Sequence, residues 1–392
     1  MTFKQRVNDV LLAIFYAERR VDPYYRDGFD RIFQRPLAGL AQGLINLTRS
    51  RGHLAIGEEK LVANERELTL AIIRQMARFL KVHYQGGVAE RAGNTKTYGV
   101  VRAEFEVLAQ LPPEVRQGLF EEPRTYPAWV RFAGPGPLSP PDIRDNGILS
   151  IGIKLMGVAG EKLLDDEKQT QDFTGISAPT FTTPNIIENL KLQRHIFDGT
   201  PIFYFLAHPL DAVMQALYSR TQTSPLEVRY WSCVPCSYGQ GPPVHYSVVP
   251  SAPGKTTIPR PPPDDYLRQA MVRTLAERAV DFDFCVQFQT DPQRMPLEDA
   301  SVEWPERLSP FRRVARLHIP VQQFDSPGQL RFARNLAYNP WHSIRAHRPL
   351  GNQSRARRSI YLELSRLRQA MNGDVHLEPT GDEAFTEDVH AG

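Results

Sequence analysis

The chain has 392 residues, of which 41% are hydrophobic and 23% charged, with a formal net charge of +3 at pH 7. This is the composition of an ordinary globular protein, and the charge is too small to indicate nucleic-acid binding. No apolar stretch reaches the ~18 residues of a transmembrane helix, and the first residues lack the pattern of a signal peptide. The three cysteines, Cys233, Cys236 and Cys285, are typical of a reducing compartment. We therefore expect a cytoplasmic protein.

Residues 1–85 are expected to form an N-terminal helical arm. Apolar residues recur at helical spacing over 7–16 and again over 66–83. Basic residues at 19 and 20 follow the first of these helices, which is compatible with a peripheral contact to a lipid surface. Packing of the arm on the domain or on a partner subunit of a homo-oligomer is the alternative.

After Gly86 and Gly87 the pattern changes to the period of two that predicts strands. Apolar residues alternate with charged ones over 101–107, and further strands are expected over 128–133, 148–156, 227–234, 245–249, 282–289 and 315–319. Helices are expected near 184–196, 208–218 and 264–279. Strands without strict alternation with helices predict an α+β fold with an antiparallel sheet, closed as a barrel to remove its edges. This unit extends over 86–372, and 373–392 forms an acidic tail that we expect to be frayed.

The chemistry is predicted from the segment 334–345. A helix over its first part would set Arg334 and Tyr338 one turn apart on one face. A positive charge beside the phenol would favour phenolate, which is a hard ligand suited to ferric iron. A surface helix end with a capping tyrosine is the structural alternative for this short pattern.

The longer pattern, with His342 four residues after Tyr338 and Arg345 three residues later, resembles the proximal haem segment of the catalase superfamily. Residues 347–357 are similar to the short catalase-related branch, to which allene oxide synthases belong. Four earlier stretches resemble catalase motifs in the expected order and bring the likeness to roughly residues 80–350: 91–99, 129–133, 142–154 and 172–181. The resemblance implies a catalase-like eight-stranded β-barrel with surrounding helices, which binds haem b.

The resemblance also implies roles for individual residues. Tyr338 would be the iron ligand, with Arg334 beside it. The remaining haem contacts would be the propionate partners Arg91, Arg131 and Arg345, the haem-edge residue His342 and the pocket residue Phe181. Asn94 stands where the family has its distal histidine, and Ile176 stands where it has a distal asparagine.

These two departures shape the predicted reaction. An asparagine can exchange hydrogen bonds but cannot take a proton at neutral pH, so Asn94 cannot act as the base that hydrogen peroxide dismutation needs. Asn94 and Thr95 would orient a substrate oxygen in a pocket that Ile176 makes more apolar. We therefore expect a haem-dependent enzyme that rearranges, dehydrates or isomerises an unsaturated fatty acid or its hydroperoxide. The alternatives are a peroxidase or weak catalase with another distal group, and a haem-binding sensor or storage protein without turnover.

Overall fold

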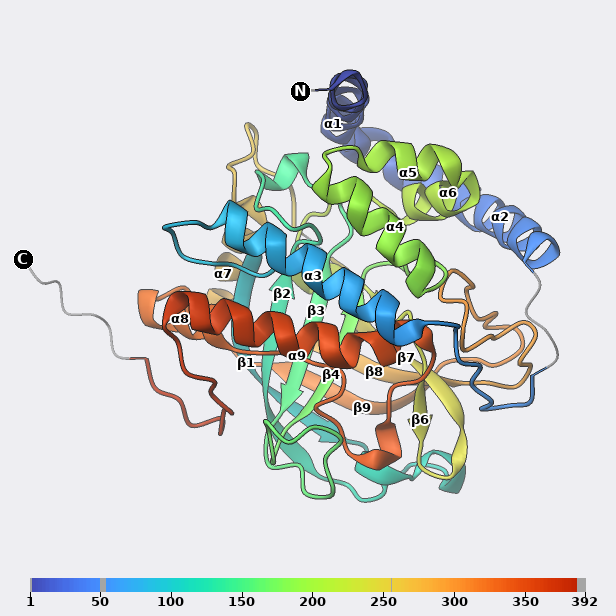
Figure 1. Cartoon of the computed structure of the whole chain (residues 1–392). Coiled ribbons are helices and arrows are strands. Elements are labelled where there is room, and N and C mark those ends of the chain that lie inside the picture. Colours follow the sequence, from blue (N-terminus) through green and yellow to red (C-terminus); the bar gives the residue numbers. More distant parts are fainter. Residues whose placement is uncertain (1, 50–53, 255, 386–392) are drawn as a thin grey trace, which may run out of the picture.

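The computed structural model of the chain describes residues 2–49, 54–254 and 256–385. Its centre is a closed antiparallel barrel of eight strands in the order β5, β4, β3, β2, β1, β9, β8, β7, and a pairing between β5 and β7 closes the ring (Figure 1). A further strand, β6, is added to β7. The predicted eight-stranded antiparallel barrel with surrounding helices is confirmed. The strands are β1 (Thr97–Val107), β2 (Thr125–Ala133), β3 (Ser150–Leu155), β4 (Gln171–Ile176), β5 (Tyr230–Trp231), β6 (Cys236–Tyr238), β7 (Gly241–Pro250), β8 (Val280–Phe288) and β9 (Arg312–Ile319).

The barrel interior is filled by apolar side chains from alternate strand positions. Ala103, Phe105 and Val107 of β1 point inward, whereas the side chains between them are charged. The rings of Phe105 and Phe284 lie 5.1 Å apart between centroids, and those of Phe173 and Phe284 lie 4.9 Å apart. The barrel is therefore a packed core without an open channel, and any site must lie on its outer face or at its ends.

Two strand predictions differ from the structure. Of the strand expected over 227–234, only Tyr230–Trp231 pairs, because residues 225–227 form a 3₁₀ turn and Cys233 has a positive φ of 56°. The strand β4, in contrast, was not predicted as a strand. It has polar residues at 171, 172 and 174, and this pattern hides its inward-facing Phe173.

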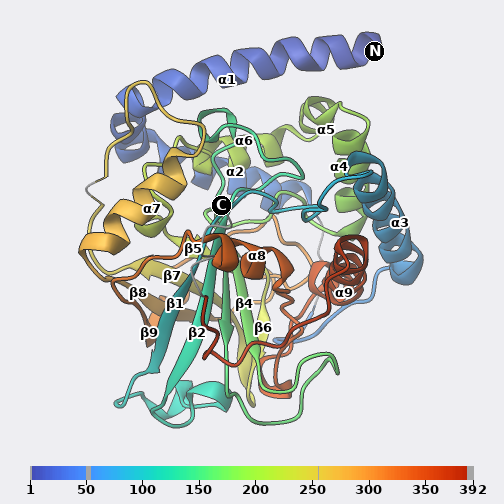
Figure 2. The ribbon, with the colours of Figure 1, turned by 90° about the vertical axis from the view of Figure 1, so that its left-hand side faces the viewer.

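Helices cover one outer face and one end of the barrel. In Figures 1 and 2, α8 and α9 lie across the outer side of β1 to β4, with α3 and α4 packed behind α9. The helices are α1 (Phe3–Phe29), a π-helical turn η1 (Asp30–Gln34), α2 (Arg35–Thr48), α3 (Glu65–His83), α4 (Ile186–Phe197), α5 (Pro201–Ala207), α6 (Pro209–Tyr218), α7 (Tyr266–Glu277), α8 (Pro327–Asn335) and α9 (Asn352–Asn372). Short 3₁₀ turns are η2 (Pro113–Val115), η3 (Gly118–Phe120), η4 (Asp142–Arg144), η5 (Pro225–Glu227) and η6 (Arg345–His347).

The N-terminal helices attach to the barrel domain at two separate places. Helices α1 and α2 lie on α5 and α6, whereas α3 lies on α9 and α4. Within the described residues, no helix is both long enough and apolar enough to cross a membrane.

The described part of the C-terminal tail packs on the barrel, where the sequence predicted a frayed segment. Glu383 accepts a hydrogen bond of 2.8 Å from the indole nitrogen of Trp129, and the ring of Phe385 lies 5.2 Å from that of Phe332. Residues 386–392 of the predicted tail lie outside the described residues. The tail thus covers the outer side of β2, close to the end of α8.

We predict that Phe385→Ala lowers the free energy of unfolding by about 1–2 kcal/mol, because a half-buried ring leaves its contacts with Trp129 and Phe332. Urea unfolding followed by tryptophan fluorescence measures this. The control is Val375→Ala in the same tail, whose side chain is 81% exposed and should change stability by less than about 0.5 kcal/mol. Equal effects of the two changes would contradict the docking of the tail.

Candidate functional site

Tyr338 lies in a loop after α8, not in the helix that the sequence predicted. The helix ends at Asn335, and Leu336 leaves it with φ −52° and ψ 132°. Arg334 pairs with Glu90, with 3.0 Å between Nε and Oε1. The prediction that a helix would set Arg334 and Tyr338 one turn apart is therefore wrong. Side chains from α9 take up the last carbonyl groups of α8, which allows the helix to stop there.

The ring of Tyr338 rests on the outer face of β3. A Cβ atom added at Gly152 would lie 2.9 Å from Cδ1 of Tyr338, so the glycine is what admits the ring. The hydroxyl group donates a hydrogen bond of 3.2 Å to the carbonyl oxygen of Trp129 on β2. The phenol is thus placed flat against the sheet with its oxygen satisfied by backbone.

The pKa of Tyr338 is raised above its usual range, chiefly by burial and then by the charge of Asp172. Arg131 and Arg91 act in the opposite direction but do not outweigh burial. The prediction that an arginine neighbour holds the phenol toward phenolate is therefore wrong for the chain as it stands. The sequence pattern paired Tyr338 with Arg334, whereas the arginines near the phenol are Arg91 and Arg131.

Three arginines lie close to one another here: Arg91 from the segment before β1, Arg131 on β2 and Arg368 on α9. Of these, Arg91 and Arg131 are close enough to Tyr338 to act on its pKa. Arg131 and Arg368 are buried, at 6% and 2% exposure. The guanidinium group of Arg131 donates to Thr97 Oγ1 at 2.8 Å and to the carbonyl oxygen of Asn94 at 2.6 Å. Burial lowers the pKa of Arg131 well below its ordinary value, and the charge of Arg91 lowers it further. Burial, followed by the Arg91 charge, lowers the pKa of Arg368 to about 9.

Two of these arginines bind the C-terminal end of α8. Arg91 donates to the carbonyl oxygens of Ala333, at 3.1 Å, and Leu336, while Arg368 donates to those of Arg334 and Asn335. A helix C-terminus carries partial negative charge, so it compensates part of this positive charge. The Nη1 atom of Arg91 is nevertheless buried without a hydrogen-bond partner. Among the described residues, none of the three guanidinium groups is ion-paired with a carboxylate.

A compact cluster of charged residues holds the loop that carries Tyr338. Lys154 on β3 and Asp172 on β4 are directly opposite each other, with 2.8 Å between Nζ and Oδ1, and Lys154 also contacts Glu167. Asp172 Oδ2 accepts from the backbone amide of Asn339 at 2.8 Å and lies 2.9 Å from Nδ1 of His342. The loop is therefore fixed to β3 and β4 on both sides of Pro340.

His342 is a charged member of this cluster, and its ring contacts the carboxylates of Asp166, Glu167 and Asp172. Burial and the charge of Lys154 lower the pKa of His342, but hydrogen bonds to Asp166 and Asp172 outweigh them and raise it to about 9. The carboxylate and imidazole groups of Glu167, Asp172 and His342 lie close enough together to hold a metal ion. The ammonium group of Lys154 already sits among them, so the cluster has its cation.

Asn94 and Thr95, which the sequence predicted to face the substrate, each have a structural role in the backbone of this segment. Asn94 has a positive φ of 49°, a conformation that asparagine adopts more readily than most residues. Thr95 is buried and donates through Oγ1 to the carbonyl oxygen of Arg91 at 2.6 Å. These two residues therefore lie beside the arginines. The carbonyl oxygen of Asn94 accepts from Arg131, and the hydroxyl group of Thr95 binds the backbone of Arg91.

The other predicted residues have partners outside this neighbourhood. Ile176, the last residue of β4, is paired with Trp231, and Phe181 lies under the guanidinium group of Arg357 at 4.8 Å. Arg345 is a surface residue, with a side chain 73% exposed and ion-paired with Glu161 at 2.8 Å. The structure thus brings Arg91, Arg131 and Tyr338 together.

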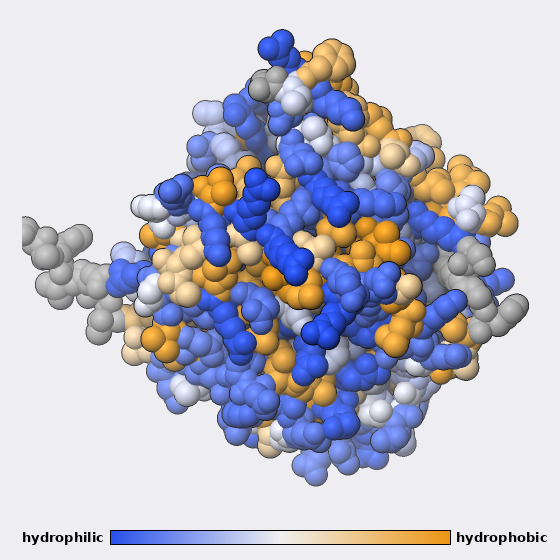
Figure 3. Space-filling view, viewed as in Figure 1, coloured by the Kyte–Doolittle hydropathy of each residue, from blue (hydrophilic) through white to orange (hydrophobic). Residues whose placement is uncertain are grey.

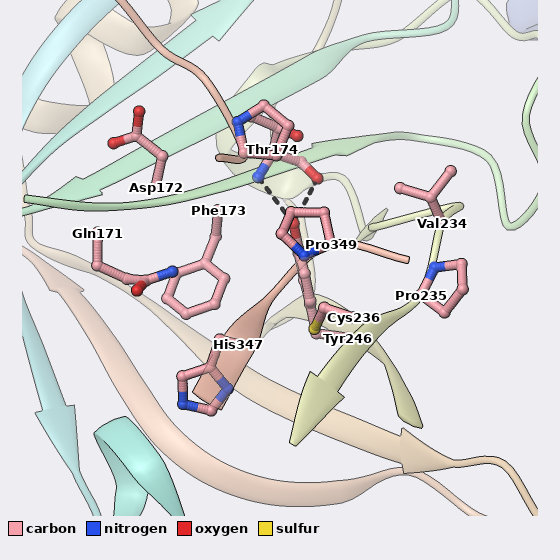
Figure 4. A pocket seen from close by; sticks show the side chains of 11 residues that line it. Gln171, Asp172, Phe173, Thr174, Val234, Pro235, Cys236, Tyr246, His347 and Pro349 are labelled. Atoms are coloured by element: carbon pink, nitrogen blue, oxygen red, sulfur yellow. Dashed lines mark hydrogen bonds between the residues drawn. The ribbon is translucent and has the colours of Figure 1, made fainter. Parts of the chain in front are cut away.

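Two cavities stand out in the described part of the chain, and neither is lined by Tyr338. One has a volume of about 20 Å³ and is lined by Phe173, Cys236, Tyr246 and His347 among others; in Figure 4, Tyr246 reaches Thr174 across it. The other, of about 250 Å³, is a surface hollow beside α7. A ligand of cofactor size needs roughly 300–1,000 Å³. The arginines thus fit the charge of haem carboxylates, but the contact of Tyr338 with Gly152 leaves no porphyrin-sized space.

Sequence reasoning missed Arg368 and the roles of Lys154, Glu167 and Asp172. The available signal for the cluster was Lys154 inside the strand expected over 148–156, since a charge on a buried strand needs a partner. Nothing in the sequence separates Arg368 from the other arginines of α9.

Comparisons with known proteins give a likeness in fold. No family model matches the chain, and no curated protein matches it. Among solved structures, a fungal catalase aligns with TM-score 0.57 and 15% identity over 82% of this chain and 66% of its own. A bacterial catalase gives 0.56 and 14% over 87% and 69%, and catalase A from Saccharomyces cerevisiae gives 0.52 and 13% over 82% and 68%. The chain spans about two thirds of the length of these catalases, and at such identity the likeness establishes a catalase-like fold.

The cluster around Asp172 predicts a pH dependence of stability. His342 has a folded-state pKa of about 9 against an ordinary 6.5. Its contribution is therefore complete below pH 6.5 and is lost as the pH rises through 9, a loss on the order of 3 kcal/mol for a shift of this size. Urea unfolding across this range should show the decline in the wild type and a flatter profile in His342→Gln. His83→Gln, which changes an exposed histidine, should retain the wild-type profile; a profile as flat as that of His342→Gln would refute the assignment.

Proposed function

We propose that this chain binds a carboxylate-bearing ligand at the group formed by Arg91, Arg131 and Arg368, and that haem is this ligand. The observation that carries the proposal is the burial of positive charge there. Two of the guanidinium groups are almost fully buried, none is paired with a carboxylate in the described residues, and Nη1 of Arg91 has no partner. The Glu90 carboxylate, which is ion-paired with Arg334, offsets only part of this buried charge, so an anion in contact with the three groups would be strongly favoured.

Haem fits the chemistry of the donors. It carries two carboxylates, which arginine binds through charge-assisted hydrogen bonds, and the phenol of Tyr338 is the type of axial ligand that catalases use. The catalase-like fold supports the same choice. When bound, haem would supply iron chemistry that no side chain of the chain offers. The residues that would hold it are Arg91, Arg131 and Arg368, with Tyr338 offering the phenolic oxygen to the iron.

Binding of haem requires room that Tyr338 now fills. The loop would have to move away from β3, and the contacts of Asp172 with Asn339 and His342 oppose that movement. A smaller carboxylate would need less room. A fatty acid bound directly by the arginines, without haem, is therefore the second candidate, favoured by the contact between Tyr338 and Gly152.

For the reaction, we propose the rearrangement, dehydration or isomerisation of an unsaturated fatty acid or its hydroperoxide, as in allene oxide synthase-like proteins, with little dismutation of hydrogen peroxide. Asn94 and Thr95, which lie beside Arg91 and Arg131, offer hydrogen bonds but no base. His342, four residues after Tyr338, is held protonated by Asp166 and Asp172 at neutral pH. The alternative functions are a weak peroxidase and a haem protein without turnover.

We predict that the purified chain binds added haemin with a Soret band. Tyr338→Phe should shift the band, because the phenolic oxygen is lost, and Arg131→Gln should weaken binding by about tenfold or more, because a charge-assisted hydrogen bond is worth about 1.5–3 kcal/mol. Arg345→Gln is the matched control, since this exposed arginine pairs with Glu161 and should bind like the wild type.

No Soret band with the wild type would refute haem as the ligand. Displacement of a fluorescent fatty acid, with a loss of affinity in Arg131→Gln, would then establish the second candidate. Circular dichroism of each variant checks that it is folded. Product analysis with linoleate hydroperoxide, beside oxygen release from hydrogen peroxide, distinguishes the proposed reaction from catalase activity.

A further inference from the structure

Helix α1 is attached to the rest of the protein by its polar side. Its fully buried residues are all polar or charged: Asn8, Arg19, Asp22 and Arg26. Asp22 accepts a hydrogen bond of 2.7 Å from the amide of Thr221, and Asn8 accepts one of 3.1 Å from the amide of Ile202. The apolar residues 11, 12, 15 and 16 are only half-buried, so the contacts that fix the helix are mainly polar, whereas a usual surface helix buries its apolar side.

The apolar side of α1 faces away from the protein. Phe3, Val10, Ile14 and Val21 lie on one side of the helix at helical spacing, and each is more than half exposed. Figure 2 shows α1 crossing the top of the molecule with the rest of the protein on one side only. The apolar side chains therefore meet solvent along the length of the helix.

The apolar surface continues onto α2 after the π-helical turn. Leu37, Leu40, Leu44 and Leu47 are exposed at spacings of three and four residues, while Ala38, Ala41 and Ile45 pack on α6. In Figure 3, orange areas lie along the upper right edge, where Figure 1 places α1 and α2 together with α5 and α6. We call these eight exposed residues of α1 and α2 the outer apolar face. A continuous exposed face of this kind marks an interaction site.

The charges beside this face are predominantly positive. Of the ionisable side chains on α1, the π-helical turn and α2, five exposed ones are cationic: Lys4, Arg6, Arg20, Arg31 and Arg35. The exposed acidic ones are Asp9 and Asp27, and Asp27 is paired with Arg220 at 2.7 Å. A helix with a basic rim and an apolar face fits an anionic lipid surface.

We propose that the outer apolar face docks the protein on an anionic membrane surface, with the apolar side chains in the interfacial layer and the basic rim on lipid phosphates. The polar attachment of α1 supports this assignment, because it leaves every large apolar residue of the helix's outer side free for lipid. Self-pairing of two copies through the same face would bring two basic rims together, which disfavours it. The proposal is independent of the carboxylate ligand.

The test is flotation of the full chain with vesicles. We expect binding to vesicles of phosphatidylcholine with phosphatidylglycerol, weaker binding to phosphatidylcholine alone, and release by salt. The combined change Val10→Ser, Ile14→Ser and Val21→Ser should weaken binding by about tenfold or more, because each side chain loses apolar area buried in lipid. Each of these side chains is more than half exposed, so folding should be little affected.

Two controls make the outcome decisive. Val82→Ser with Val321→Ser changes exposed valines elsewhere and should bind vesicles like the wild type. Arg6→Gln with Arg20→Gln should lose mainly the salt-sensitive part of binding. Absence of vesicle binding by the wild type, or equal losses in both sets of valine variants, would overturn the proposal. A dimer in light scattering that the α1 variant dissociates, without vesicle binding, would assign the face to a second copy of the chain.

Discussion

The carboxylate of Asp172 is the contact on which the candidate site depends. It faces Lys154 across two neighbouring strands and also holds the amide of Asn339 and the ring of His342. Through these bonds it fixes the loop after α8 to the barrel, and with it the position of Tyr338. The cluster is stable because its buried charges are of opposite sign and compensate each other. Removal of one charge would leave the others buried without a partner, which destabilises the fold. The barrel provides a rigid surface, and this cluster holds the loop with Tyr338 against it.

The site combines an excess of positive charge with a shortage of space. The carbonyl groups at the end of α8 satisfy part of the hydrogen-bonding capacity of Arg91 and Arg368, and the threonine and backbone oxygens near Asn94 satisfy Arg131. Dipoles of this kind stabilise a charge without neutralising it. A ligand with carboxylates could supply the neutralisation, whereas the phenol against Gly152 closes the entrance. Under the proposed function, binding of a ligand would require the loop to move, and the Asp172 contacts would set the cost of that movement.

The barrel could be predicted from sequence because its determinants are local. The alternation over 101–107 places four apolar side chains on one side whatever the rest of the chain does. The helix over Tyr338 could not be predicted correctly, because α8 is ended by Arg368 and Gln369, more than thirty positions further along the chain. The motif likeness identified Arg91, Arg131 and Tyr338 as neighbours, but it also included Arg345, whose exposure depends on a loop that no periodicity describes. Helical spacing over 7–16 predicted a helix there. The sequence could not show that its outer apolar side chains face solvent, because this depends on the distant partners of Asn8, Arg19 and Asp22.

The polar attachment of α1 has a consequence for how the protein comes apart. The barrel is held by buried apolar area, which salt strengthens or leaves unchanged, whereas α1 is held largely by hydrogen bonds of Arg19 and Asp22 and by the ion pair of Asp27 with Arg220. The two parts therefore respond to solvent in opposite ways. We therefore expect α1 to open locally while the barrel remains folded, so that amide exchange in α1 reports this local opening and not unfolding of the whole chain.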